Sequence, residues 1–204
     1  MCPDSKSDAD DHRASIPKAF RSENLDFRSY NFKEDDEFFH SFQTSSSSII
    51  NWCASTPRPM DVNFTSRVAK HLQRRSHLFV IAYINNEYYC GFPIGTIFLK
   101  SSHRDMVHHR CSQLEVSIEK EHRHYEAEAI NWALKWTFNS ANLHWVEVNI
   151  PSWNLRMGKL CDEVGFHTEG ERKECYFKDG EWWNEVNMSM LKKDWEERQP
   201  QTKR

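Results

Sequence analysis

The sequence has 204 residues, a length typical of a single domain with a substantial core. Its 27 Lys and Arg residues against 30 Asp and Glu residues give a net charge of −3. This balance argues against a protein that binds nucleic acid through a basic face, and no apolar run is long enough to suggest a membrane protein.

The two ends of the chain are polar. Residues 1–19 are predicted to be a disordered tail, 20–196 a single domain and 197–204 a second disordered tail. The first tail lacks the apolar core of a signal peptide, and the six cysteines include no C-x-x-C pair. These features favour a cytoplasmic protein with reduced thiols.

Hydrophobic periodicity predicts alternating elements in the first half of the chain. Asn63 or Thr65 is the expected cap of the second helix. The segment after residue 44, rich in serine, receives no assignment, and residues 101–111 are expected to form a polar loop. The elements predicted in this half are, in chain order, a strand at 25–30, helices at 31–42 and 63–75, and strands at 78–84 and 92–99.

The second half contains a strand-helix-strand pattern. Strands at 113–118 and 145–150 flank a helix at 125–141, so the two strands should be parallel, with ligands bound near the amino end of the helix. A short helix is expected to open at Asn154 and close at Gly165. Segments 166–177 and 181–191 then form a predicted hairpin.

Several local strings, in this order and spacing, resemble the GNAT superfamily of acyl-CoA N-acyltransferases, and most closely its ribosomal-protein alanine N-acetyltransferase branch. The resemblance covers roughly Phe20 to Trp195 and implies an α/β (α+β) fold. Its sheet would be mixed and mostly antiparallel, with six to seven strands and a central βαβ crossover. The strings are Pro93–Ile97, Glu128–Ala129, Trp136–Phe138, Leu143–Glu147, Asn154–Phe166, Glu169–Gly170, Gly180–Trp183 and Trp195.

The resemblance implies acetyl-CoA as co-substrate, with its diphosphate held by backbone N–H groups at the start of the long helix. The family loop there carries glycines, whereas this chain has His124 and Glu126 in their places and a loop about two residues shorter. The residues assigned to co-substrate binding are Ile118, Arg123, His124, Tyr125, Asn154 and Lys159. Asn154 also fits a plain helix cap.

Four residues are candidates for catalysis. Glu115, Ser117 and Glu119 lie on or just after one strand, where a carboxylate could deprotonate an ammonium group. Cys161 stands where many family members have a tyrosine that protonates the departing thiolate. The alternatives are a solvated strand face for the first three and a buried structural thiol for Cys161.

The acceptor implied by the resemblance is a small-molecule amine or a protein N-terminus; the oligomeric state is left open. Five histidines between His103 and His124 are expected to be loop residues, and no metal site is predicted. Trp182 and Trp183 could line the acceptor pocket or pack within the hairpin. In an alternative hypothesis, the fold has lost acyl-CoA binding and uses an aromatic-rich pocket to bind or cyclise an apolar small molecule.

Overall fold

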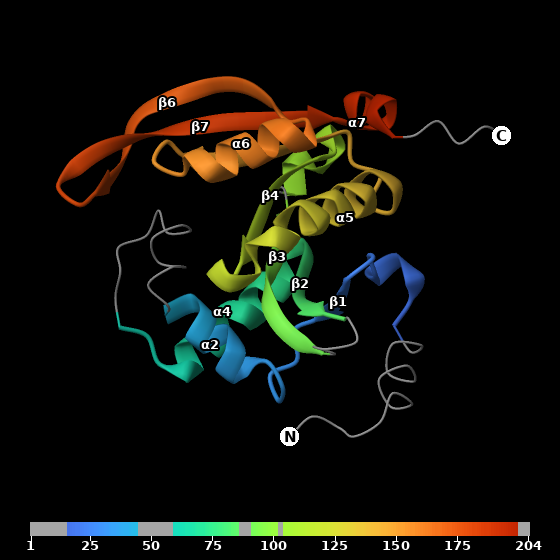
Figure 1. Cartoon of the computed structure of the whole chain (residues 1–204), viewed down its shortest axis with the longest axis vertical. Helices are drawn as coiled ribbons and strands as arrows, with labels where there is room; N and C mark the ends of the chain where they lie inside the picture. The colour runs from blue at the N-terminus through green and yellow to red at the C-terminus, as the bar shows by residue number, and fades with distance from the viewer. Residues whose placement is uncertain (1–15, 45–58, 86–90, 102–103, 200–204) are drawn as a thin grey trace. The chain divides into compact units, whose positions relative to one another are not determined.

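The computed structural model describes residues 16–44, 59–85, 91–101 and 104–199 (Figure 1). Most of the predicted N-terminal tail, the unassigned serine-rich segment and His103 lie outside this description. The described residues belong to two compact units. Unit 1 contains the chain up to Phe98 together with Val116–Trp132, and unit 2 contains Leu99–Glu115 and the chain from Ala133 onward.

Seven strands form one mixed sheet in the order β1-β2-β3-β4-β5-β7-β6, which confirms the expected fold class. In chain order the strands are β1 (Leu25–Ser29), β2 (Ser76–Ile84), β3 (Phe92–Lys100), β4 (Cys111–Ile118), β5 (Trp145–Pro151), β6 (His167–Lys178) and β7 (Glu181–Leu191). The α-helices are α2 (Asp36–Thr44), α4 (Val62–Arg75), α5 (Glu126–Asn139), α6 (Leu155–Val164) and α7 (Lys192–Arg198). Short 3-10 helices span η1 (Lys18–Phe20), η2 (Arg104–His109) and η3 (Lys120–Tyr125).

Two helix starts differ from the sequence expectation. Helix α2 begins at Asp36 rather than Asn31, because the Asp35 carboxylate accepts the Asn31 backbone N–H at 2.7 Å and closes a turn there. Helix α4 is capped by Asp61, whose carboxylate accepts the Phe64 N–H at 2.6 Å, so the predicted caps Asn63 and Thr65 are wrong. An Asp cap satisfies one of the first N–H groups of the helix.

The core of unit 1 is aromatic. Helices α2 and α4 lie side by side (Figure 1) and pack their apolar faces on β2. Gly95 of β3 permits close backbone approach, because a Cβ there would lie 2.8 Å from Cα of Ile118 and still closer to the Ser117 carbonyl. The buried cluster consists of Tyr30, Phe39, Ala69, Phe79, Ile81, Tyr83 and Phe98.

Unit 2 contains the parallel pairing that the sequence predicted. The β4–β5 ladder joins Cys111 to Trp145 and ends where Gln113 pairs with Glu147, although both strands continue beyond it. Strand β5 pairs antiparallel with β7 along the whole length of β5, from Trp145 opposite Leu191 to Pro151 opposite Glu185. Strands β6 and β7 form the predicted hairpin, which is long and curved in Figure 1.

Capping residues set the ends of α6. Asn154 caps its start through a bond from the Met157 N–H at 3.3 Å. Gly165 ends it at a φ of 110°, a left-handed conformation that favours glycine. Beyond β7, Trp195 is buried in α7 and its ring centroid lies 5.4 Å from that of Phe138. Helix α7 continues to Arg198, two residues into the predicted tail. Among the described residues, no helix has the length and apolarity needed to span a membrane.

Candidate active site

One face of the unit 2 sheet carries polar side chains. Residues paired across neighbouring strands project to the same face, and so do residues two apart along a strand. The ladders pair Gln113 with Glu147, and Asn149 with Asn187. The polar face therefore consists of Gln113, Glu115, Glu147, Asn149, Glu185 and Asn187. The opposite face of β5 carries the buried Val146, Val148 and Ile150.

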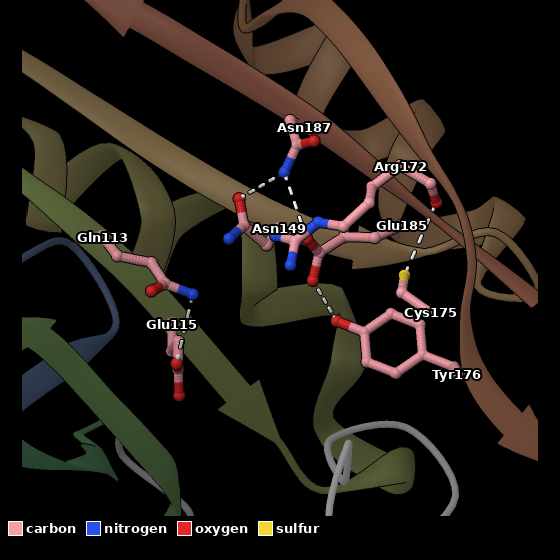
Figure 2. A network of polar contacts seen from close by, with 8 residues as sticks. All are labelled: Gln113, Glu115, Asn149, Arg172, Cys175, Tyr176, Glu185 and Asn187. Carbon is pink, nitrogen blue, oxygen red and sulfur yellow. Dashed lines mark hydrogen bonds and ion pairs between the residues drawn. The ribbon is translucent and has the colours of Figure 1, made fainter.

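Glu115 occupies the point where β4 leaves its ladder with β5. It lies two residues beyond Gln113, whose Nε2 is 3.5 Å from a Glu115 carboxylate oxygen (Figure 2). Burial raises the pKa of Glu115, and the positive charge of Lys100 on β3 opposes that rise. A half-buried carboxylate with a raised pKa is suited to accept a proton near neutral pH.

Glu147 is a second desolvated carboxylate on the polar face, and the sequence analysis missed it. Burial raises its pKa, Lys100 lowers it, and the charge of Glu185 raises it again. The alternation of Trp145 to Ile150 could have placed Glu147 on a polar face, and parallel pairing would have set it beside Gln113. Its proximity to Lys100, however, depends on the sheet order.

Glu185 is the centre of a hydrogen-bond network on the hairpin (Figure 2). Its side chain is only 8% exposed and forms an ion pair with Arg172 at 2.5 Å. It also accepts hydrogen bonds from the Tyr176 hydroxyl and from Asn187 Nδ2, the latter at 3.3 Å. Asn187 in turn donates to Asn149 Oδ1 at 3.1 Å, which links the hairpin to β5.

The sequence candidates on α6 have unequal access to solvent. Lys159 is exposed, whereas Cys161 is buried with 1% of its surface accessible. That burial fits the structural interpretation of the Cys161 thiol, and its role as an acid stays a prediction. The Asn154 carboxamide oxygen serves as the helix cap, and its amide nitrogen could still contact a ligand.

The remaining candidates belong to unit 1. Ser117 is half-buried and Ile118 is buried at the end of β4. The backbone N–H of Glu119 bonds to the Ile94 carbonyl at 2.8 Å, and burial, followed by the charge of Glu121, raises the pKa of the Glu119 carboxyl.

The predicted diphosphate segment is η3, which leads directly into α5. His124 is exposed, and its ring centroid lies 4.1 Å from that of the half-buried Tyr125. The Arg123 Nε is buried, without a hydrogen-bond partner among the described residues. Glu126, the first residue of α5, is only 2% exposed, so its side chain is withdrawn from solvent.

The paired tryptophans separate onto opposite faces of the hairpin. Trp182 is 61% exposed and its ring packs against that of Phe177 at 5.1 Å. Trp183 is half-buried, and its ring lies 5.9 Å from that of Trp153 in an edge-to-face arrangement. The hairpin-packing interpretation therefore holds for Trp182.

The chain matches known proteins at three levels. Residues 24–167 match the family model described as an acetyltransferase (GNAT) domain. An uncharacterized N-acetyltransferase of Bacillus subtilis, YnaD, is 30% identical over 71 residues, which are 35% of this chain and 42% of that protein. The ribosomal protein uS5 alanine N-acetyltransferase of Escherichia coli is 29% identical over 68 residues, which are 33% of this chain and 35% of that protein. The matches thus span about two fifths or less of these relatives.

Solved structures share the fold over a longer range. Spermidine N-acetyltransferase from Vibrio cholerae, in complex with CoA and spermine, superposes with a TM-score of 0.73 at 21% identity, covering 84% of this chain and 98% of that one. A GNAT-family acetyltransferase from Bacillus anthracis gives a TM-score of 0.70 at 18% identity, covering 85% and 98%. At these identities the likeness establishes the fold alone.

Proposed function

Because the chain belongs to the GNAT acetyltransferase family, we propose that it moves an acetyl group from acetyl-CoA to an amine by direct attack, without a covalent enzyme intermediate. The observation that carries this proposal is the position of Glu115. It lies just past the end of the β4–β5 ladder, on a polar face, in surroundings that raise its pKa.

Glu115 is the proposed general base. Acetyl-CoA supplies a thioester whose carbonyl carbon the acceptor nitrogen attacks. Glu115 first removes one proton from the acceptor ammonium, which frees the nitrogen lone pair. As the C–N bond forms, the C–S bond breaks, and the nitrogen's remaining excess proton balances the charge on the departing thiolate. The net products are an acetamide, CoA thiol and one proton held by Glu115.

The amino end of α5 is the proposed contact for the diphosphate. Arg123 and His124 supply cationic or hydrogen-bonding groups on η3, and α5 supplies the positive end of a helix dipole. The Arg123 Nε has no hydrogen-bond partner among the described residues, so it is available to the diphosphate, and the nearby Glu126 is buried. The residues present in unit 1 thus fit an anionic group.

The names of the relatives support a broad class of acceptor, but no single acceptor. Their names include a ribosomal-protein alanine and spermidine, both of which present an ammonium group. We assign this chain the same broad class, a small-molecule amine or a protein N-terminus. Cys111, Cys161 and Cys175 are free thiols, as is usual in the reducing cytoplasm, where acetyl-CoA is also present. We therefore propose a cytoplasmic location.

Thermal unfolding with added acetyl-CoA tests the first step. A ligand at a hundredfold excess over its Kd stabilises a protein by about 3 kcal/mol, which raises Tm by several degrees. No shift at millimolar acetyl-CoA would overturn the proposal and favour a fold adapted to another ligand.

Release of CoA thiol with spermidine or an alanine-terminated peptide as acceptor tests the second step. Glu115→Gln should lower kcat by about 100-fold or more. The matched control is Glu197→Gln, which changes an exposed carboxylate on α7 and should leave turnover unaltered. Equal activity of the two variants would exclude Glu115 as the base.

A further inference from the structure

Two aromatic rings in unit 2 lie at steep angles to the ring of Trp153. Trp153, two residues after the end of β5, has its ring centroid 5.5 Å from that of Tyr176 at an interplanar angle of 72°. Its centroid is 5.9 Å from that of Trp183, at 82°. Tyr176 and Trp183 are paired across the hairpin. We call Trp153, Tyr176 and Trp183 the aromatic box; all three are half-buried and thus partly open to solvent.

The register of the hairpin creates this grouping. Between Arg172 and Tyr176 the ladder shifts, so that the three residues from Lys173 to Cys175 lie opposite Asn184 alone. Glu174 adopts a φ of 49° there, and its N–H donates to Asn184 Oδ1 at 2.8 Å. Because of this bulge, Tyr176 pairs with Trp183, two residues from Glu185 on the same strand face.

The aromatic box already contacts a cation from its own chain. Nζ of Lys178 lies 5.2 Å from the centroid of the Trp153 ring. The face of an aromatic ring carries negative potential and attracts an ammonium group at such a distance. Lys178 is otherwise held by Asp179, whose carboxylate is 3.1 Å away and 84% exposed. An exposed ion pair of this kind contributes little, so Lys178 can leave at small cost.

The surroundings of the aromatic box favour a positive ligand. The Tyr176 hydroxyl donates to the buried Glu185 carboxylate, which increases the electron density of the Tyr176 ring. Trp183 and Glu185 are two residues apart on β7, and Glu185 pairs with Pro151 on the strand face that carries Glu147 and Asn149. Tyr176 and Trp183 therefore lie on the face of the unit 2 sheet that also carries Glu115.

We propose that the aromatic box binds an alkylammonium group, and that Lys178 is an internal occupant which this ligand displaces. The acceptor amine, as a diamine or polyamine, would place an ammonium group there that is not acetylated. That second assignment rests on the proposed function, whereas cation binding by the box does not.

A binding experiment without acetyl-CoA tests the box itself. Choline is the probe, and dimethylbutanol, its neutral carbon isostere, is the matched ligand; calorimetry measures both. Choline should bind about tenfold more tightly than the isostere. Lys178→Gln, which removes the internal cation without altering the rings, should tighten choline binding about two- to fivefold. Equal affinities for choline and the isostere, or no change in Lys178→Gln, would overturn the proposal.

Ring substitutions locate the binding. Trp153→Leu should remove the preference for choline, and Trp153→Phe should retain part of it, which guards against a folding defect in the first variant. Trp182→Leu is the control, because Trp182 pairs with Phe177 on the other face of the hairpin. Loss of choline binding in Trp182→Leu, or its retention in Trp153→Leu, would place the cation elsewhere.

Steady-state kinetics test the acceptor role separately. With spermidine as acceptor, Trp153→Phe should raise the KM for spermidine severalfold and leave the KM for acetyl-CoA unchanged. Glu115→Gln should lower kcat by about 100-fold or more but bind choline like the wild type. Absence of acetylation with intact choline binding would overturn the proposed function but not cation binding by the box. Acetylation with the same KM for spermidine in Trp153→Phe and the wild type would overturn the acceptor role of the box.

Discussion

The Tyr176 hydroxyl donates a hydrogen bond to the Glu185 carboxylate across the β6–β7 hairpin. Burial raises the pKa of Tyr176 well above its usual range, and the hydrogen bond and charge of Glu185 raise it further. The neutral phenol is thus the form that the folded protein stabilises. The pair joins the hairpin network of Figure 2 to the aromatic box.

Tyr176→Phe should reduce the free energy of unfolding by about 1 kcal/mol at neutral pH, the usual contribution of one hydrogen bond. Because the folded-state pKa is raised above the unfolded value near 10, this contribution is fully present below about pH 10 and is lost as pH rises toward the folded-state pKa. Urea unfolding of both proteins across that range measures the difference. If the stability advantage of the wild type over Tyr176→Phe grows as the pH rises above about 10, the raised pKa of Tyr176 is contradicted.

Lys100→Met should shift the pH dependence of kcat/KM. A base acts when deprotonated, so the rate rises with pH through the pKa of Glu115. Lys100 lowers that pKa, and its removal should move the rising limb to higher pH. Lys193→Met, at an exposed position on α7, is the control and should leave the limb in place. If the rising limb of kcat/KM lies at the same pH in Lys100→Met as in the wild type, the limb reports the pKa of a group other than Glu115.

Asn154 is predicted to serve both as a helix cap and as a ligand contact, and two substitutions separate these roles. Asn154→Ala removes the cap, so it should cost about 1 kcal/mol of stability and should also weaken turnover. Asn154→Ser can retain the cap but loses the amide nitrogen. Turnover is measured by thiol release. If Asn154→Ser turns over at the wild-type level, Asn154 acts only as a helix cap and not as a ligand contact.

Glu126→Gly tests whether the segment before α5 binds the diphosphate of acetyl-CoA with its natural side chains. Since Glu126 is buried, the change should lower Tm without abolishing activity and with little effect on the KM for acetyl-CoA. A glycine at the first turn of a helix also costs conformational entropy. A sharp gain in CoA affinity, detected by calorimetry, would instead show that the natural side chain disables the loop.

Local signals in the sequence were sufficient for much of the fold. Asn154 and Gly165 identified the ends of α6, because a cap and a left-handed glycine are determined by neighbours in the chain. The strand-helix-strand pattern predicted that β4 and β5 are parallel. The cap of α4 was placed two or four residues too late, because Asn63 and Thr65 are already helical, whereas Asp61 has the extended backbone that a cap needs.

The site was less predictable. Glu115 follows from strand alternation, but Glu147 becomes relevant only through Lys100, which belongs to a strand distant in sequence. The partners of Glu185 depend on how many residues the bulge adds to β6, and no periodicity specifies that number. Helix α7 packs its Trp195 against Phe138 and continues to Arg198, and the polar composition of the end of the chain gave no signal of that tertiary contact.

The bulge between Arg172 and Tyr176 also offers a route for divergence. Deleting one residue from the bulge would turn the Tyr176 side chain to the opposite face of the hairpin and break up the aromatic box. The pairing of β6 with β7 before the bulge would be kept. Under the proposed acceptor role of the aromatic box, a single insertion or deletion in this edge strand would be enough to change the acceptor preference. Homologues should then differ in length at this position more than in the identity of their aromatic residues.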